Sequence, residues 1–390
     1  MKSITPGSTR SLELLRLVAL LFALGGCGGG VDSGGTGATN TYSSGPITGF
    51  GSIIVNGVRF DDSSATVTDD DGFPRALGLG MTVEVRGSAI TIDATGSRSS
   101  ASSISISSEI VGRIRSTSGN ALDVLGQSVE VRPGTVFAGS FPGVGDFVEV
   151  YALYNAADNV YVATRIEHKT SPPSEYRIRG KVLELNAIPG TFKLGTELIS
   201  YSALAPGDVP AGLADGAIVR VRVKATPLAG GVWQATRLRD GASRPDEGAH
   251  IEVEGLIENF FPGQFKVGGV AIATNASTDV VVPPGVTLGN GIRVEVEGSY
   301  SGGVLVAARV VFEDDSGPPE FTLEGSIEDV DGNAKTIRVR GQTISYTPTT
   351  EYRTNPPRSE ADLRIGAIVK VKATLINGIQ LQATRIEFSN

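Results

Sequence analysis

Internal repetition constrains this sequence more than any other feature. A Gly-x-x-Val-x-Val pattern recurs at spacings of 65, 71, 75 and 75 residues. Its copies begin at Gly80, Gly145, Gly216, Gly291 and Gly366. Fewer than 20 residues after each of the last four copies, a second pattern of Ala, a small residue, Arg and an aliphatic residue begins, at Ala163, Ala235, Ala307 and Ala383. Repetition at this period predicts about five modules of roughly 70 residues.

Each module is expected to be a small β-structure. The Gly-x-x-Val-x-Val segment alternates apolar and charged residues, which is typical of a strand with one buried face. Asn56-Gly57 separates two apolar runs, as in a two-residue hairpin turn. Because closing a small sheet into a barrel removes its exposed edges, we predict an all-β tandem array of about five OB-like barrels. The expected modules are residues 45–108, 109–174, 175–247, 248–319 and 320–390, with proline-rich segments at the later boundaries.

The N-terminus carries targeting information. Basic residues precede an apolar run over residues 17–24, which is too short to span a bilayer and is typical of a signal peptide. Leu24-Gly25-Gly26-Cys27 resembles the lipobox of bacterial lipoproteins, and Cys27 is the single cysteine of the chain. The resemblance implies cleavage after residue 26, a lipid on Cys27 and, because Gly28 follows, an outer-membrane location. An ordinary cleavable signal is the alternative. Residues 27–44, rich in Gly, Ser and Thr, are expected to form a flexible tether.

The sequence offers little for catalysis. His168 and His250 have no partners nearby in the sequence, and with one cysteine a zinc site is not expected. Asp69-Asp70-Asp71, with Asp61 and Asp62, could supply oxygen ligands to calcium, but the spacing is that of a turn rather than an EF-hand. We therefore predict no cofactor, no metal and no enzyme activity. The net charge of −8 argues against nucleic-acid binding.

The sign of the charge reverses between modules three and four. Alternate positions of the first and fourth expected strands are basic in module three, at Arg177, Arg179, Arg220, Arg222 and Lys224. The matching positions of module four are acidic, at Glu252, Glu254, Glu295 and Glu297. If these strands are neighbours, like charges lie side by side and repel. Three explanations stay open: modules three and four dock through these faces, the basic face binds an anionic envelope polymer, or water and salt screen it.

The lipobox and tether are followed by Gly45 to Phe60 (GPITGFGSIIVNGVRF) and Leu77 to Gly87 (LGLGMTVEVRG). This combination resembles exported bacterial proteins that carry domain of unknown function 5666. The resemblance implies export and a repeated β module, and it implies no catalytic residues. We expect a lipid-anchored cell-envelope protein with a structural or binding role and a membrane, envelope polymer or protein as partner. The alternatives are a binding protein for a glycan or anionic polymer, and an envelope enzyme.

Overall fold

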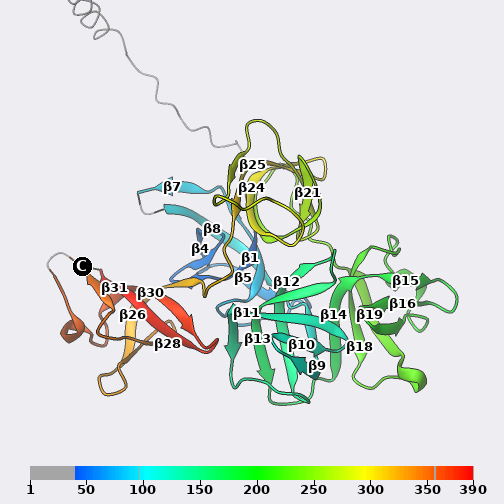
Figure 1. Cartoon of the computed structure of the whole chain (residues 1–390), viewed down its shortest axis with the longest axis horizontal. Coiled ribbons are helices and arrows are strands. Elements are labelled where there is room, and N and C mark those ends of the chain that lie inside the picture. The colour runs from blue at the N-terminus through cyan, green and yellow to red at the C-terminus, as the bar shows by residue number, and fades with distance from the viewer. Residues whose placement is uncertain (1–39, 95, 355–356, 390) are drawn as a thin grey trace, which may run out of the picture. The chain divides into compact units, whose positions relative to one another are not determined.

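The computed structural model describes residues 40–94, 96–354 and 357–389, so Cys27 and the expected signal peptide lie outside the described residues. The regular secondary structure of the described residues is almost entirely β-strand (Figure 1). Its only helices are three 3₁₀ turns, η1 (Pro206–Asp208), η2 (Ala229–Gly231) and η3 (Glu360–Asp362). None of the helices in this part of the chain is long and apolar enough to cross a membrane.

The strands fall into five groups in chain order. Barrel 1 comprises β1 (Asn40–Pro46), β2 (Gly49–Phe50), β3 (Ile53–Val55), β4 (Val58–Asp61), β5 (Thr66–Asp69), β6 (Thr82–Ser88), β7 (Thr91–Asp93) and β8 (Gly96–Ile106). Barrel 2 comprises β9 (Ile110–Ser118), β10 (Ala121–Val124), β11 (Gln127–Ala138), β12 (Phe147–Asn155) and β13 (Val160–Lys169). Barrel 3 comprises β14 (Glu175–Lys181), β15 (Leu183–Asn186), β16 (Thr191–Leu194), β17 (Glu197–Ser200), β18 (Ile218–Lys224) and β19 (Trp233–Asp240).

The last two groups follow the same order. Barrel 4 comprises β20 (His250–Phe261), β21 (Gln264–Val267), β22 (Val270–Ala273), β23 (Asp279–Val281), β24 (Arg293–Ser301) and β25 (Val304–Phe312). Barrel 5 comprises β26 (Glu320–Asp331), β27 (Thr336–Val339), β28 (Gln342–Ser345), β29 (Glu351–Arg353), β30 (Ile368–Ile376) and β31 (Gln380–Phe388).

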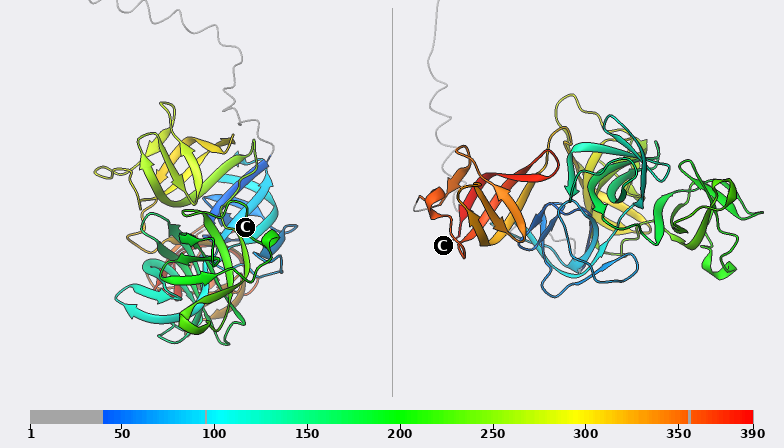
Figure 2. Two further views of the ribbon diagram at one scale, coloured as in Figure 1. Left: turned by 90° about the vertical axis from the view of Figure 1, so that its right-hand side faces the viewer. Right: turned by 90° about the horizontal axis from the view of Figure 1, so that it is seen from below.

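Every group closes into a ring of five strands with one topology. In barrel 4, antiparallel pairs join β20 to β21 and β21 to β22, a parallel pair joins β22 to β25, and antiparallel pairs join β25 to β24 and β24 back to β20. The other barrels repeat this order, with the first strand interrupted in barrels 1 and 3. Figure 2 shows the first barrel, in blue, as such a ring. In each ring the first strand pairs with the second and the fourth, and the third strand pairs in parallel with the fifth. This is the strand order of an OB-like barrel, so the predicted fold is confirmed.

The two sequence patterns have separate structural reasons. The glycine of each Gly-x-x-Val-x-Val copy lies two residues before the fourth strand of its barrel, with φ between +76° and +98°. Residues that carry a side chain rarely adopt this backbone conformation, so glycine is favoured at the turn that leads into the fourth strand. The second pattern marks a β-bulge, because the pairing of the fourth and fifth strands shifts between the Ala and the Arg. A bulge bends its strand and helps the barrel to close.

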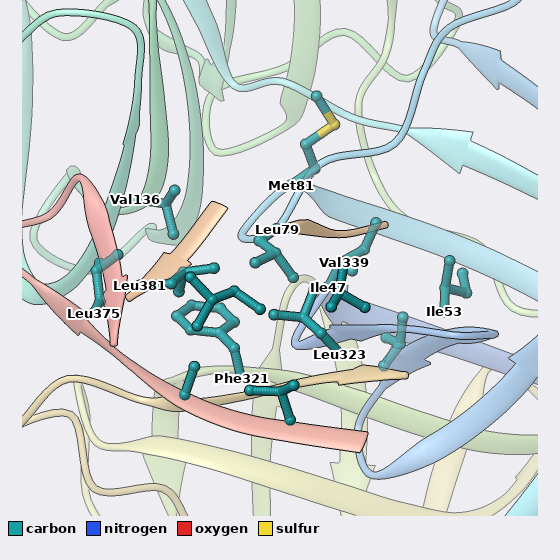
Figure 3. Close-up of a cluster of buried hydrophobic side chains, with 14 of the residues drawn as sticks. Ile47, Ile53, Leu79, Met81, Val136, Phe321, Leu323, Val339, Leu375 and Leu381 are labelled. Carbon is teal, nitrogen blue, oxygen red and sulfur yellow. The ribbon is translucent and has the colours of Figure 1, made fainter. Parts of the chain in front are cut away.

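The barrels are joined across the sequence as well as along it. Strand β1 of barrel 1 pairs in parallel with β20 of barrel 4, and β2 pairs in parallel with β26 of barrel 5. Strand β9 of barrel 2 pairs with β14 of barrel 3. The apolar core of barrel 1 is also continuous with that of barrel 5, where Ile47 and Leu79 pack in one cluster with Phe321 and Leu323 (Figure 3). Barrel 1 therefore contacts partners far away in sequence, which the repeat pattern alone did not predict.

Candidate functional site: the arginine face and the clasp loop

Six arginines form a grid on three adjacent strands of barrel 3. Strand pairing places Arg177 of β14, Arg222 of β18 and Arg237 of β19 in one row, and Arg179, Arg220 and Arg239 in the next. We call these six residues the arginine face. The predicted pairing of like charges on the first and fourth strands is therefore present. Such neighbours repel, so the face requires anions to offset it.

The anions come from barrel 1. Residues 70–81 connect β5 to β6, and we call them, together with Asp69 at the end of β5, the clasp loop. Asp69 Oδ1 accepts hydrogen bonds from the N–H groups of Asp71 (2.9 Å) and Phe73 (3.0 Å), which closes a tight turn. This turn presents Asp70 and Asp71, whose side chains are only 10% and 7% exposed. Two of the five aspartates named as possible calcium ligands, Asp70 and Asp71, thus face arginines. No group of acidic, histidine or cysteine residues suited to a metal ion occurs among the residues that the structure describes.

The contacts between the clasp loop and the arginine face are direct. Asp70 Oδ2 accepts hydrogen bonds from Arg220 Nη1 at 2.6 Å and Arg177 Nη1 at 3.2 Å. Asp71 accepts from Arg222 and, through Oδ1, from Arg237 Nη1 at 3.1 Å and Arg239 Nη2 at 3.2 Å. Burial raises the pKa of Asp70 against the lowering effect of Arg220. Burial, and then repulsion by Arg237 and Arg239, lowers the pKa of Arg222.

The clasp loop also binds barrel 2, with the signs exchanged. Glu149 and Glu167 of barrel 2 occupy the strand positions that Arg220 and Arg239 occupy in barrel 3. Both accept from Arg75 of the clasp loop, with Arg75 Nη1 2.8 Å from Glu149 Oε1 and Arg75 Nη2 2.6 Å from Glu149 Oε2. Burial would raise the pKa of Glu149, but Arg75 and Lys169 hold it at about 2. One loop therefore presents acids to a basic barrel face and a base to an acidic one.

The remaining basic residues of the predicted face have other partners. Arg179 is buried and donates from Nη1 to Glu109 Oε2 at 3.0 Å and from Nε to the Gly241 carbonyl at 2.6 Å. Lys224 is exposed, with Nζ 3.5 Å from Gln234 Oε1. The carboxylates of Asp70 and Asp71 that contact the arginine face thus come from barrel 1, and none of the three explanations left open by the sequence included this partner. The glutamates of barrel 4 have the sign of charge that the arginine face needs, but strand β20, which carries Glu252 and Glu254, pairs with β1 of barrel 1.

The four glutamates of barrel 4 form their own face. Pairing places Glu252 opposite Glu297 and Glu254 opposite Glu295. Arg293 Nε donates to Glu254 Oε1 at 2.6 Å, and His250 Nε2 lies 3.6 Å from carboxylate oxygens of both Glu252 and Glu297. Burial, followed by the nearby Glu254, raises the pKa of Glu295 to about 8. Glu295 therefore holds a proton near neutral pH, and the printed contacts of the other three glutamates are with Arg293, His250 and strand β1 rather than with the arginine face.

A cavity of about 70 Å³ lies where four barrels meet. Its lining includes Gly45 of barrel 1, Leu153 of barrel 2, Arg179 of barrel 3 and Leu256 of barrel 4. Glu258 also lines it and is 6% exposed. Burial raises the pKa of Glu258 to about 7. The junction of the barrels is thus polar and charged rather than purely apolar.

The second histidine lies in a Ser-His-Asp grouping on the surface of barrel 2. Ser140 Oγ is 2.7 Å from His168 Nδ1, while His168 Nε2 is 3.7 Å from Asp146 Oδ2. That second distance is too long for a hydrogen bond, and Asp146 Oδ2 accepts instead from the Gly143 N–H at 2.8 Å. Since a catalytic histidine needs an acid that orients it, this grouping lacks the geometry of a triad.

Sequence reasoning missed part of the site. Arg237 lies in the recurring Ala-Thr-Arg-Leu segment of module three and Arg239 directly follows it, so aligning the fifth strand with the fourth would have placed both in the same grid. Arg75 and the aspartates of the clasp loop carried no comparable signal, because their partners are in other modules.

The architecture and these contacts define a protein of tandem OB-like barrels held together by charged faces. The chain belongs to the family described as "Domain of unknown function (DUF5666)", whose model matches residues 44–95, 111–167, 245–311 and 324–387, more than half of the chain. Barrel 3 lies outside these segments although it has the same topology. No curated protein is significantly similar to the chain. A solved structure titled "drosophila Unr CSD456" is similar over 56% of this chain and 98% of that chain, with 15% identity and a TM-score of 0.14.

Proposed function

We propose that this protein is a non-catalytic, lipid-anchored structural component of the bacterial cell envelope, held at the outer membrane through Cys27. The observation that carries the proposal is the position of barrel 1, which contacts every other barrel. Its first strand begins at Asn40, so residues 40–44 of the expected tether belong to barrel 1 and the segment between Cys27 and the first barrel is correspondingly shorter. The clasp loop contacts barrels 2 and 3, and β1 and β2 pair with barrels 4 and 5. A single anchor at residue 27 would therefore hold a cross-linked assembly rather than a string of independent modules.

The charge pattern supports a structural role. The carboxylates that offset the arginine face belong to the chain itself, and they are buried by the contact. Further ion pairs between barrels join Arg59 to Glu324 at 2.9 Å and Arg115 to Glu197 at 2.6 Å. An assembly of this kind would present its remaining surface to an envelope polymer or protein.

The anchor is tested on the full chain made in a bacterial host that processes lipoproteins. Intact-mass analysis and membrane fractionation are applied to the native protein and to Cys27→Ala. The proposal expects a mature chain that begins at Cys27 with added acyl mass, and a variant that leaves the membrane fraction. An unmodified, freely soluble native chain would refute anchoring and leave a secreted protein.

A second candidate function is binding of an anionic envelope polymer or glycan. The observation that favours it is the exposure of Arg237 and Arg239, whose side chains are 50% and 37% exposed although both contact Asp71. Retention of the protein on lipopolysaccharide vesicles, and its loss in Arg237→Gln with Arg239→Gln, would support this role. Equal retention of the native protein and the double variant would exclude this face as the binding site.

A further inference from the structure

A small, partly open space remains between the clasp loop and the arginine face. It measures about 10 Å³, close to the minimum for one water-sized sphere. Its lining residues are Asp70, Arg177, Arg220, Val221, Arg222, Arg237 and Arg239. Five of these seven residues are arginines, so the cavity is electropositive in spite of the clasp loop.

The charges around this cavity do not balance. Arg177, Arg220, Arg222, Arg237 and Arg239 contribute five positive charges. The carboxylates that contact these arginines are Asp70, Asp71 and Glu175, the last with Oε2 3.3 Å from Arg222 Nη1. Within direct contacts two positive charges are therefore left over, and Asp69 nearby, which acts on Arg222 and Arg239 without contacting them, offsets at most one of them. In this partly buried place attraction and repulsion are weakly screened.

Two donors that belong to the cavity lining lack acceptors. The Nε–H groups of Arg177 and Arg222 are buried and have no hydrogen-bond partner among the described residues. Leaving a buried charged donor without an acceptor costs more than the bond itself would contribute. Burial lowers the pKa of Arg222 and of Arg239, in each case with a further lowering by the neighbouring Arg237, as expected where positive charge is not fully offset.

We infer that this cavity binds one monatomic halide ion, chloride under physiological conditions, between barrels 1 and 3. A halide supplies the missing negative charge and accepts hydrogen bonds from several directions. A single-atom ion needs the smallest widening of a space of about 10 Å³, whereas sulfate, phosphate and carboxylate ligands carry several heavy atoms and would displace more of the lining. The inference rests on the contact between the clasp loop and barrel 3 used in the proposed function, and it adds a ligand to that contact.

The test uses the full chain at constant ionic strength. Thermal unfolding followed by Trp233 fluorescence is compared in sodium chloride, sodium bromide, sodium sulfate and sodium gluconate. We expect a saturable rise of the unfolding temperature of at least ~1 °C in chloride and bromide relative to gluconate and sulfate, because a ligand that binds only the folded state stabilises it. Chlorine NMR line broadening by the folded protein gives a direct second measurement that needs no variant.

The variant Arg177→Gln with Arg222→Gln removes both unpartnered donors and the surplus charge. It should lose the halide effect on unfolding and the chlorine line broadening. Lys372→Gln is the matched control, because Lys372 occupies in β30 the position that Arg222 occupies in β18, and it pairs with Glu320 instead. The control should keep both effects.

Two results would overturn the inference. If unfolding and the chlorine linewidth of the native protein do not respond to chloride, the cavity holds water or nothing. If the response persists in the double variant, the halide binds elsewhere. The contact itself is tested separately by Asp71→Asn, so a chloride-independent protein that is still weakened by Asp71→Asn would reject the halide site and leave the proposed assembly intact.

Discussion

Asp71→Asn tests whether the clasp loop stabilises barrel 3. The substitution keeps the shape of the side chain and removes its charge, which is 7% exposed and contacts three arginines. Breaking a buried ion pair costs ~3–5 kcal/mol and an exposed one ~0–1 kcal/mol. Asp71 is buried, but the side chains of Arg222, Arg237 and Arg239 are 26%, 50% and 37% exposed. We therefore expect a loss of ~2 kcal/mol, or roughly thirtyfold in the unfolding equilibrium.

Barrel 3 contains its own reporter for this loss. Trp233 is the single tryptophan of the chain, is 7% exposed, and donates from its indole to Glu197 in the same barrel. Urea unfolding followed by its fluorescence should show a midpoint lowered by ~1 M, if the slope is ~2 kcal/mol per M. Added salt should recover part of the loss, because it screens the repulsion that the missing charge exposes.

Asp62→Asn is the matched control. It lies in the same barrel as Asp71, and among the described residues its side chain makes no ion pair. The control should unfold with the native midpoint. If Asp71→Asn had the same urea midpoint as the control, the stability of barrel 3 would not depend on the clasp loop. The clasp loop would then not stabilise an assembly of barrels 1 and 3.

Two further substitutions probe the other charged faces. Glu149→Gln should weaken the contact of barrel 1 with barrel 2 by ~3 kcal/mol at pH 7. Because the folded pKa of Glu149 is about 2, below its usual value of 4.5, this stabilisation is present above about pH 4.5 and disappears as the pH falls toward 2. Calorimetry at pH 7 and pH 3 should show the native and variant proteins converging at the lower pH, and a constant difference would contradict the assignment. Glu295→Gln should have the opposite pattern, because its folded pKa of about 8 means that stability falls as the pH rises from about 4.5 to 8. The variant should match the native protein near pH 5 and exceed it by ~2 kcal/mol at pH 8, while exposed Glu328→Gln should follow the native protein at both.

The fold was predictable because its signals are local and repeated. The glycine before each fourth strand and the bulge in each fifth strand obey conformational rules that act within a few residues, and their recurrence fixes the module length. The opposition of Arg177 to Arg222 and of Glu252 to Glu297 also follows from strand order within one barrel. These parts needed no knowledge of how barrels pack.

The contacts between barrels were not predictable in the same way. The arginine face called for an anion, and the nearest acidic face in sequence belonged to module four. Asp70 and Asp71 supply it instead, because the turn capped by Asp69 projects from barrel 1 onto β14, β18 and β19. A turn rich in aspartate has the same sequence whether it faces water or five arginines, so composition could not distinguish the two.

The pairing of β1 with β20 has a consequence for how the chain matures. Thr41 pairs with His250, so the first strand of the chain has no partner along this edge until a strand some 200 residues later has been synthesised. Until then its outer edge stays open, and open edges invite association with other chains. The edge of β2 stays unpaired for longer, because its partner β26 is synthesised later than β20. We expect the newly made chain to need protection by chaperones until barrel 5 has been made, and truncation before β20 to yield a protein that aggregates even though barrels 1 to 3 are complete.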